Sequence, residues 1–119
     1  VVLKVAPMGG VRPAVRVAAG CGLPVVVSSA LDTSVGIAAG AALAAALPDL
    51  PYACGLGTVG LMAADVTAAP LAPDGGRLPV RPVSPDPEQL TALAAPPDRW
   101  TWWEDRLRRC HARLAGIGP

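Results

Sequence analysis

The chain has 119 residues, which is enough for one domain of ordinary size. Apolar residues make up 52% of it, aromatic residues only 3%, and ten basic against nine acidic side chains give a net charge of +1. This balance argues against a nucleic acid or an anionic membrane recognised through bulk charge. The three cysteines are odd in number and show no paired spacing, which argues against a disulfide framework or a zinc cluster and favours a cytoplasmic location.

Neither a membrane span nor a signal peptide is visible in the sequence. The longest apolar run, residues 35–47, is too short to cross a bilayer, and no charged segment precedes an apolar core at the N-terminus. The chain starts directly in a strand-like apolar run without Met. We therefore expect either a segment from within a longer protein or a start site assigned too far downstream.

Residues 1–65 are predicted to alternate between strands and helices. Apolar, β-branched runs predict strands over residues 1–6, 24–29 and, more briefly, 52–56. Helices are expected between them, over about 13–19 and over 35–47. Continuous apolar strands separated by helices are typical of a parallel sheet covered on both faces. The predicted fold class is therefore α/β, either a doubly wound sheet or part of a (β/α) barrel.

Glycines and small polar residues mark the ends of these helices. Gly20 and Gly22 are expected to end the first helix. Asp32, Thr33 and Ser34 offer N-terminal caps for the second.

Residues 66–119 differ in composition and are predicted to form a proline-rich connection followed by helices. Eight of the 14 prolines fall between Pro70 and Pro97. A turn or hairpin is expected within residues 71–83, a short helix over 88–95, and a final helix from Pro97 to about residue 115.

The final helix carries one apolar stripe that is expected to need a partner surface. Its members recur at spacings of three and four residues: Trp100, Trp103, Leu107, Cys110 and Leu114. On the polar side, Glu104 with Arg108 and Asp105 with Arg109 are expected to form i,i+4 ion pairs.

Lys4, the only lysine, is the first candidate for chemistry. It lies between Leu3 and Val5 near the C-terminal end of a predicted strand, where barrel enzymes hold their catalytic groups. A buried ammonium is costly without a partner, and it can serve as a general base or a cationic clamp. The alternative is a strand-end lysine with a buried stem and a solvated head.

Ser28, Ser29 and Gly55 are the other candidates. The serine hydroxyls end the second predicted strand, and the helix start that follows offers amides that attract a carboxylate or phosphate. Without further context, ordinary helix capping is the preferred explanation. Gly55 follows the third predicted strand, where a glycine either lets backbone approach a ligand or simply makes a turn.

The remaining conspicuous residues are interpreted as structural. Gly36 and Gly40 favour close packing of their helix on the sheet. His111 is expected at the surface, and the tryptophans in a packing stripe. The cysteines, at positions 21, 54 and 110, are most simply small buried hydrophobic residues.

Three segments together resemble o-succinylbenzoate synthase, a family of the enolase superfamily. Residues 2–10, with the pattern Lys-x-x-Pro-x-Gly-Gly, resemble the sixth barrel strand and its following turn. Residues 25–36, with Ser-Ser-Ala-Leu-Asp-Thr-Ser, resemble the seventh strand and helix start, and residues 52–58 resemble the eighth. The resemblance implies the C-terminal part of a (β/α)7β TIM-like barrel, strands six to eight, over residues 1–65. Residues 66–119 are then an extension that packs on the barrel and the capping domain.

The resemblance also implies a reaction. The family dehydrates 2-succinyl-6-hydroxy-2,4-cyclohexadiene-1-carboxylate to 2-succinylbenzoate in menaquinone biosynthesis, with a lysine removing the proton α to the carboxylate while Mg²⁺ holds the enediolate. Lys4 corresponds to the lysine across the site, whose implied role is cationic stabilisation. Ser28, Ser29 and Gly55 correspond to the region that receives the succinyl side chain of this small carboxylate substrate.

Large parts of the family pattern are missing from these 119 residues. They contain neither the Lys-x-Lys pair that supplies the base, nor the three carboxylate ligands of Mg²⁺, nor the capping domain. The resemblance therefore implies a C-terminal third that is inactive alone and needs the N-terminal barrel and capping segments as partners. Two alternatives remain: an N-acylamino acid racemase, dipeptide epimerase or cycloisomerase of the same superfamily, and a non-catalytic packing module.

Overall fold

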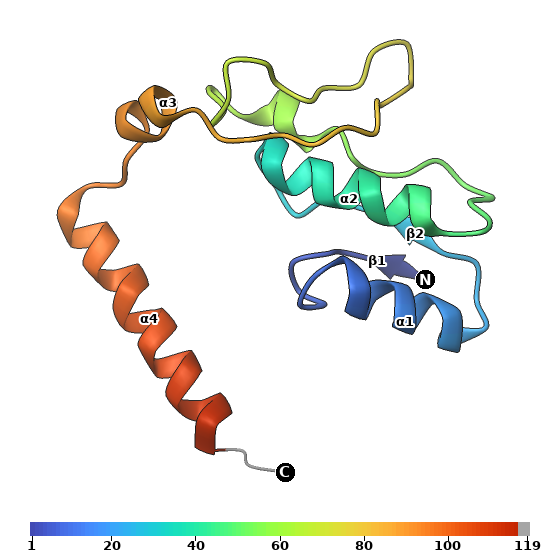
Figure 1. The fold of residues 1–119 in the computed structure, drawn as a ribbon, viewed down its shortest axis with the longest axis horizontal. Coiled ribbons are helices and arrows are strands. Elements are labelled where there is room, and N and C mark those ends of the chain that lie inside the picture. The colour runs from blue at the N-terminus through green and yellow to red at the C-terminus, as the bar shows by residue number, and fades with distance from the viewer. Residues whose placement is uncertain (117–119) are drawn as a thin grey trace.

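The computed structural model describes residues 1–116, in which a small parallel sheet packs against two helices (Figure 1). The sheet consists of β1 (Val2–Leu3) and β2 (Val26–Val27), paired in parallel with Val2 opposite Val26. α1 (Val11–Cys21) connects the two strands, and α2 (Ser34–Ala46) follows β2. The predicted α/β class and the parallel pairing are therefore confirmed.

The rest of the chain is mostly irregular before two further helices. It contains the 3-10 helix η1 (Thr58–Leu61), then α3 (Pro87–Ala92) and α4 (Pro97–Gly116). Between η1 and α3, Asp74 and Arg77 exchange two backbone hydrogen bonds of 2.9 Å. The two intervening glycines have φ values of 53° and 76°, as a two-residue hairpin turn requires. The predicted hairpin is thus present, as a tight turn.

The strands are shorter than predicted. The chain turns over residues 5–9 directly after β1, so the ladder ends there. The predicted third strand, residues 52–56, is not a strand but joins β2 through one parallel bridge between Gly55 and Ser28. That prediction is wrong because strand length depends on the number of paired neighbours, which apolar runs alone do not specify.

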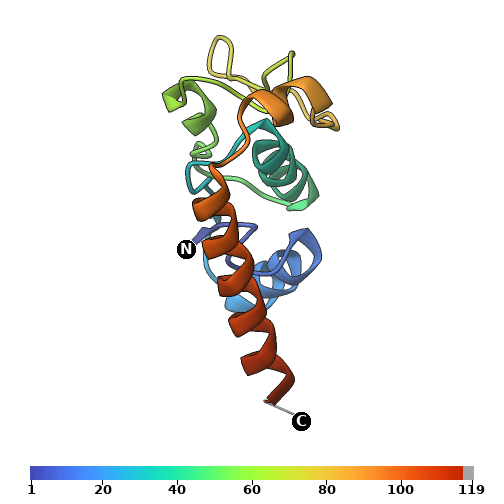
Figure 2. The ribbon, with the colours of Figure 1, turned by 90° about the vertical axis from the view of Figure 1, so that its left-hand side faces the viewer.

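α1 and α2 lie on the same side of the sheet (Figures 1 and 2). Leu3 and Val27 face them and are 4% and 0% exposed, whereas Val2, on the opposite face, is 59% exposed. The prediction of a sheet covered on both faces is therefore wrong within residues 1–116. The reason is geometric, because two successive right-handed crossovers in one direction place both helices on one face.

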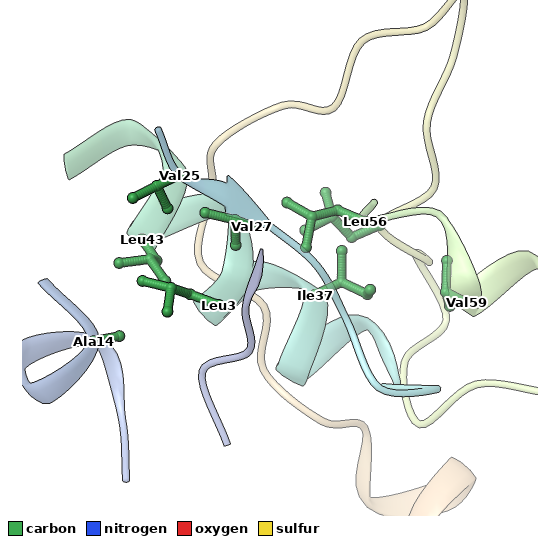
Figure 3. Close-up of a cluster of buried hydrophobic side chains, with 9 residues drawn as sticks. Leu3, Ala14, Val25, Val27, Ile37, Leu43, Leu56 and Val59 are labelled. Carbon is green, nitrogen blue, oxygen red and sulfur yellow. The ribbon is translucent and has the colours of Figure 1, made fainter. Parts of the chain in front are cut away.

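The hydrophobic core lies between this face and the helices, and Figure 3 shows most of its members. These are Leu3, Ala14, Val25, Val27, Ile37, Leu43, Leu56, Val59 and Leu71. Leu71 comes from the proline-rich half of the chain and is only 1% exposed. The core therefore takes residues from both halves.

The helix ends agree only in part with prediction. Gly22 ends α1 in the left-handed conformation, with φ 64°. Gly20 lies inside α1, so the prediction that it stops the helix is wrong, because the chain needs the left-handed conformation only two residues later. At the start of α2, the Thr33 side chain makes no capping hydrogen bond. The cap comes instead from Asp65, whose carboxylate accepts a hydrogen bond from the Ser34 amide at 3.0 Å.

Asp65 connects α2 to the segment that follows η1. Its Oδ1 also accepts from the Val66 amide at 2.9 Å, and the Ser34 hydroxyl oxygen accepts from the Leu71 amide at 2.7 Å. Burial alone would raise the pKa of Asp65. Hydrogen bonds from the Ser34 side chain and from the Ser34 and Val66 amides lower it by more, so the pKa lies below its ordinary 3.8. A charged carboxylate at this position also fits the positive end of the helix dipole.

The position of α2 depends on residue 40 having no side chain. A Cβ atom on Gly40 would lie 2.6 Å from Cδ2 of Leu56, which is 6% exposed. Gly40 thus allows close packing as predicted, although its neighbour Leu56 lies outside the two strands of the sheet. Gly36 has a different neighbour, since a Cβ there would lie 2.7 Å from Cβ of Asp32 in the turn before the helix.

α4 extends away from α1 and α2 and buries none of its residues (Figure 1). The tryptophans and leucines of its apolar stripe are 47–71% exposed. Cys110 is exposed as well, so the prediction that it is buried is wrong, whereas Cys21 and Cys54 pack half-buried against the core. His111 is exposed as predicted. Within residues 1–116, no helix combines the length and the apolar character that crossing a bilayer requires.

On the charged side of α4, the predicted pair of Glu104 with Arg108 is confirmed and the second predicted pair is not. Arg108 binds both Glu104 at 3.4 Å and Asp105 at 2.9 Å. The predicted pair of Asp105 with Arg109 is therefore wrong, because the i+3 arginine already takes this carboxylate. On the same helix, Trp102 and Trp103 meet edge to face at 4.8 Å, with the Arg99 guanidinium 4.5 Å above the Trp102 ring.

Replacing Gly40 by alanine is expected to destabilise the fold. Overpacking a core costs about 1–3 kcal/mol, and alanine regains roughly 0.5–1 kcal/mol in a helix interior. We expect G40A to lower the free energy of unfolding by about 1 kcal/mol, measured by urea unfolding followed by far-UV circular dichroism. Gly20→Ala is the matched control, because a Cβ there meets nothing within 4 Å, and it is expected to stabilise α1. Equal stability of the two variants would contradict the packing described.

The Asp65 cap predicts a pH dependence. Because the pKa of Asp65 is lowered in the folded chain, its contribution is present above pH 3.8 and is lost as the pH falls through the lowered pKa. We expect the parent chain to exceed Asp65→Asn by about 1 kcal/mol in the free energy of unfolding near neutral pH, and the difference to vanish in stronger acid. Asp74→Asn, on the exposed hairpin turn, controls for the loss of one carboxylate. A difference between parent and D65N that does not change with pH would refute the charged cap.

Candidate functional site

The Lys4 side chain extends from the end of β1 over the end of β2. Its ammonium donates a hydrogen bond to the Ser29 carbonyl oxygen and another to the Ser28 hydroxyl oxygen at 3.3 Å. The residue is half-buried. Lys4 is therefore held by β2, with its nitrogen directed at the two serines.

The parallel register explains why these residues meet. Leu3 lies opposite Val27, so the next residue, Lys4, comes opposite Ser28, and Ser28 in turn bridges Gly55. Opposing residues of a parallel pair point to the same face. Lys4, Ser28 and Gly55 thus form a row across the face that α1 and α2 leave uncovered, beside the C-terminal ends of β1 and β2.

Gly55 contributes space to this row. A Cβ atom at this position would lie 3.0 Å from Ser28 Oγ, closer than such contacts normally are. The backbone of Gly55 is fixed at the same time, since its amide donates to the Val27 carbonyl at 2.9 Å. A glycine here therefore leaves room around the Ser28 hydroxyl on the uncovered face.

Ser28 and Ser29 have different surroundings. Ser29 is 4% exposed, and its hydroxyl donates to the Gly55 carbonyl at 3.0 Å and lies 2.8 Å from Thr58 Oγ1. Ser29 thus meets Lys4 through its carbonyl, while the Ser28 hydroxyl meets Lys4 directly. Sequence reasoning did not identify Thr58, although its hydroxyl stands three residues after Gly55 in the same glycine-containing run.

The loop between Ser29 and α2 is strained at one residue. Leu31 has a φ of 62°, a conformation that a leucine rarely adopts. Next to it, the Asp32 carboxylate accepts a hydrogen bond from the Ala30 amide at 3.1 Å. The first amide of α2 is already occupied by Asp65, so capping, rather than an open anion site, describes this helix start.

The charges around the site favour an anionic ligand. The ion pairs found within residues 1–116 are those of Arg108, so Lys4 has no carboxylate partner in that part of the chain. Nor does this part contain a group of three or more His, Cys, Asp or Glu side chains that could hold a metal ion. An ammonium and a hydroxyl without nearby carboxylates do not fit Mg²⁺.

Comparison with known proteins bears on this arrangement. No family model matches the chain. Curated proteins named o-succinylbenzoate synthase are similar to it: those of Mycobacterium leprae, Mycobacterium tuberculosis and Mycobacterium ulcerans are 58%, 57% and 56% identical over 113 residues. Each alignment covers 95% of this chain but only 34% of the relative, so the chain spans about a third of the length of the relatives it matches. The resemblance seen in the three segments is therefore confirmed, and nearly the whole chain is similar to one third of proteins that carry this name.

Proposed function

We propose that this chain forms part of an o-succinylbenzoate synthase, a hydro-lyase of menaquinone biosynthesis that converts 2-succinyl-6-hydroxy-2,4-cyclohexadiene-1-carboxylate to 2-succinylbenzoate. The observation that carries the proposal is the meeting of the Lys4 ammonium with Ser28 and Ser29 at the ends of parallel strands. The identity of 56–58% to relatives of that name supports it. The three free cysteines favour a cytoplasmic location.

The one-sided sheet supports a place in an enolase-type barrel. In such a barrel the helices lie outside, and alternate strand residues line the interior. α1 and α2 share one face of the sheet, and the row of Lys4, Ser28 and Gly55 lies on the other. In this proposal β1 and β2 are barrel strands six and seven, and the segment within residues 52–56 that bridges Ser28 through Gly55 takes the place of strand eight.

Residues 66–119 then form the connection and the helices that pack on the barrel and the capping domain. The apolar stripe of α4, 47–71% exposed at its tryptophans and leucines, supports a covering surface outside residues 1–116. Leu71 and the Ser34–Leu71 hydrogen bond attach the start of this connection to the barrel portion.

Lys4 has the donors to stabilise negative charge on the substrate. A lysine ammonium carries three N–H groups, and two of them are directed at the Ser29 carbonyl and the Ser28 hydroxyl. The third remains for a substrate carboxylate or for the charge that develops as the α proton leaves. Because the ammonium is already held in place, it needs little reorganisation when that charge develops. The space at Gly55, beside the Ser28 hydroxyl, suits the succinyl side chain.

In this proposal, Mg²⁺ is held by residues outside this chain. The site described here does not fit the metal, so we assign the carboxylate ligands, and the lysine base that removes the proton, to the part of the relatives' length that this chain does not span. The same part supplies the remaining barrel and capping segments.

The purified chain is expected to show no Mg²⁺-dependent dehydration, because the metal ligands and the base lie outside it. Product formation is measured by chromatography of 2-succinylbenzoate. Turnover above that of buffer alone would contradict this division of the site.

A chimera tests the function itself. In it, this chain replaces the matching third of the Mycobacterium leprae relative, and it is expected to dehydrate the substrate. Lys4→Met in the chimera is expected to lower kcat by about 10²–10³-fold, the usual effect of removing one preorganised charge-stabilising group. Arg12→Met, an exposed cation of α1, is the control and is expected to keep the parent kcat.

Two results would count against the proposal. A folded but inactive chimera refutes the assigned reaction, and a K4M chimera with the parent kcat refutes the role of Lys4. A dehydrating chimera also argues against the non-catalytic packing module.

A further inference from the structure

We propose that Thr58 is a positioning residue, which holds the Ser29 carbonyl where it receives the Lys4 ammonium. The two hydrogen bonds involved share one residue. Thr58 Oγ1 lies 2.8 Å from Ser29 Oγ, and the carbonyl of the same serine accepts from Lys4. Thr58 therefore acts on Lys4 only through Ser29. The effect of this contact on catalysis rests on the proposed function. The contact itself does not, because all three residues belong to this chain.

Which hydroxyl donates in the contact between Ser29 and Thr58 follows from the single proton that each hydroxyl carries. Ser29 has one hydroxyl proton, which it donates to the Gly55 carbonyl at 3.0 Å. The Thr58 hydroxyl must then donate to Ser29 Oγ. The Ser29 amide also donates to the Gly55 carbonyl, at 2.9 Å. The amide and the side chain of Ser29 are thus both fixed, which fixes the Cα atom from which the carbonyl extends. The Ser28 hydroxyl donates to the same carbonyl at 3.2 Å.

Thr58 is well placed to act as an anchor. It is the first residue of η1, and the next residue, Val59, is 5% exposed in the hydrophobic core. Ser29 itself is 4% exposed, so water has little access to replace the threonine hydroxyl. The second contact of Lys4, to Ser28 Oγ, is long at 3.3 Å. The orientation of the Ser29 carbonyl therefore largely determines where the flexible lysine places its nitrogen.

The single lysine of the chain allows a direct test without substrate. With ¹⁵N-lysine labelling, one side-chain ammonium signal is expected, and NMR measures the exchange of its protons with water. Thr58→Val is expected to speed this exchange about fivefold, the factor that corresponds to a net hydrogen-bond contribution of about 1 kcal/mol. Thr58→Ser keeps the hydroxyl and is expected to retain the parent rate.

A matched control separates a local effect from a general one. Thr101→Val makes the same chemical change on α4, where the hydroxyl donates to the Pro97 carbonyl of its own helix at 2.9 Å. It is expected to leave the exchange at Lys4 unchanged. Exchange that is as slow in T58V as in the parent would overturn the proposal.

A double-mutant cycle tests whether Thr58 acts through Ser29. If it does, T58V changes the exchange in the parent chain but adds nothing in the Ser29→Ala background. Additive effects would show that Thr58 acts by another route and would also overturn the proposal. Far-UV circular dichroism monitors folding, with Thr58→Ala as a second variant. Loss of the helical signal in T58V and T58A alike would assign Thr58 to stability, against the proposal.

The chimera keeps the two proposals distinguishable. T58V in it is expected to lower kcat with little change in KM, because Lys4 acts on charge that develops during the reaction. An inactive parent chimera, with exchange in the chain still dependent on Thr58, refutes the proposed function and leaves the positioning role. An active chimera with exchange independent of Thr58 refutes the positioning role alone.

Discussion

The pairing of β2 on both of its edges organises the rest of the structure. One edge pairs with β1 and the other reaches Gly55, both in parallel. As a result Lys4 meets Ser28, although the two are 24 residues apart in the sequence. The register also decides which face each side chain takes, since a slip of one residue would turn Lys4 towards the helices. The core and the candidate site therefore depend on the same few backbone hydrogen bonds.

α2 has no polar stripe to orient it, because it consists almost entirely of alanine, glycine and aliphatic residues. Its position follows from specific contacts instead. Gly40 admits Leu56 on one side, and Asp65 holds the first turn through the Ser34 amide. Both partners come from residues that follow the helix in the sequence. The segment from η1 to Leu71 therefore completes the packing of α2, which small side chains alone would leave loosely defined.

The sequence allowed the helices and the hairpin to be predicted, because these depend on local signals, and the placement of Lys4 and Ser28 at strand ends brought both residues into view as candidates. Gly22 ends α1, the two glycines between Asp74 and Arg77 favour a tight turn, and Lys4 and Ser28 both stand at strand ends. Long-range choices were not predictable. Strand length and the uncovered face depend on neighbouring strands and crossovers, and the cap of α2 comes from a residue 31 positions away. Within the site, the different roles of the Ser28 and Ser29 hydroxyls follow from alternation along β2, which fixes sides only once the register is known.

The position of the tryptophans means that their fluorescence reports on only one part of this molecule. All three tryptophans lie on α4, and Tyr52 is the only other aromatic residue of the chain. Indole emission therefore reports on one water-facing helix, in which an edge-to-face ring pair sits under a guanidinium group. The hydrophobic core around Ile37 and Leu43 contains no tryptophan and therefore contributes nothing to this emission. A blue shift of the emission would signal that another surface has closed over α4, even while the sheet and its helices remain unchanged.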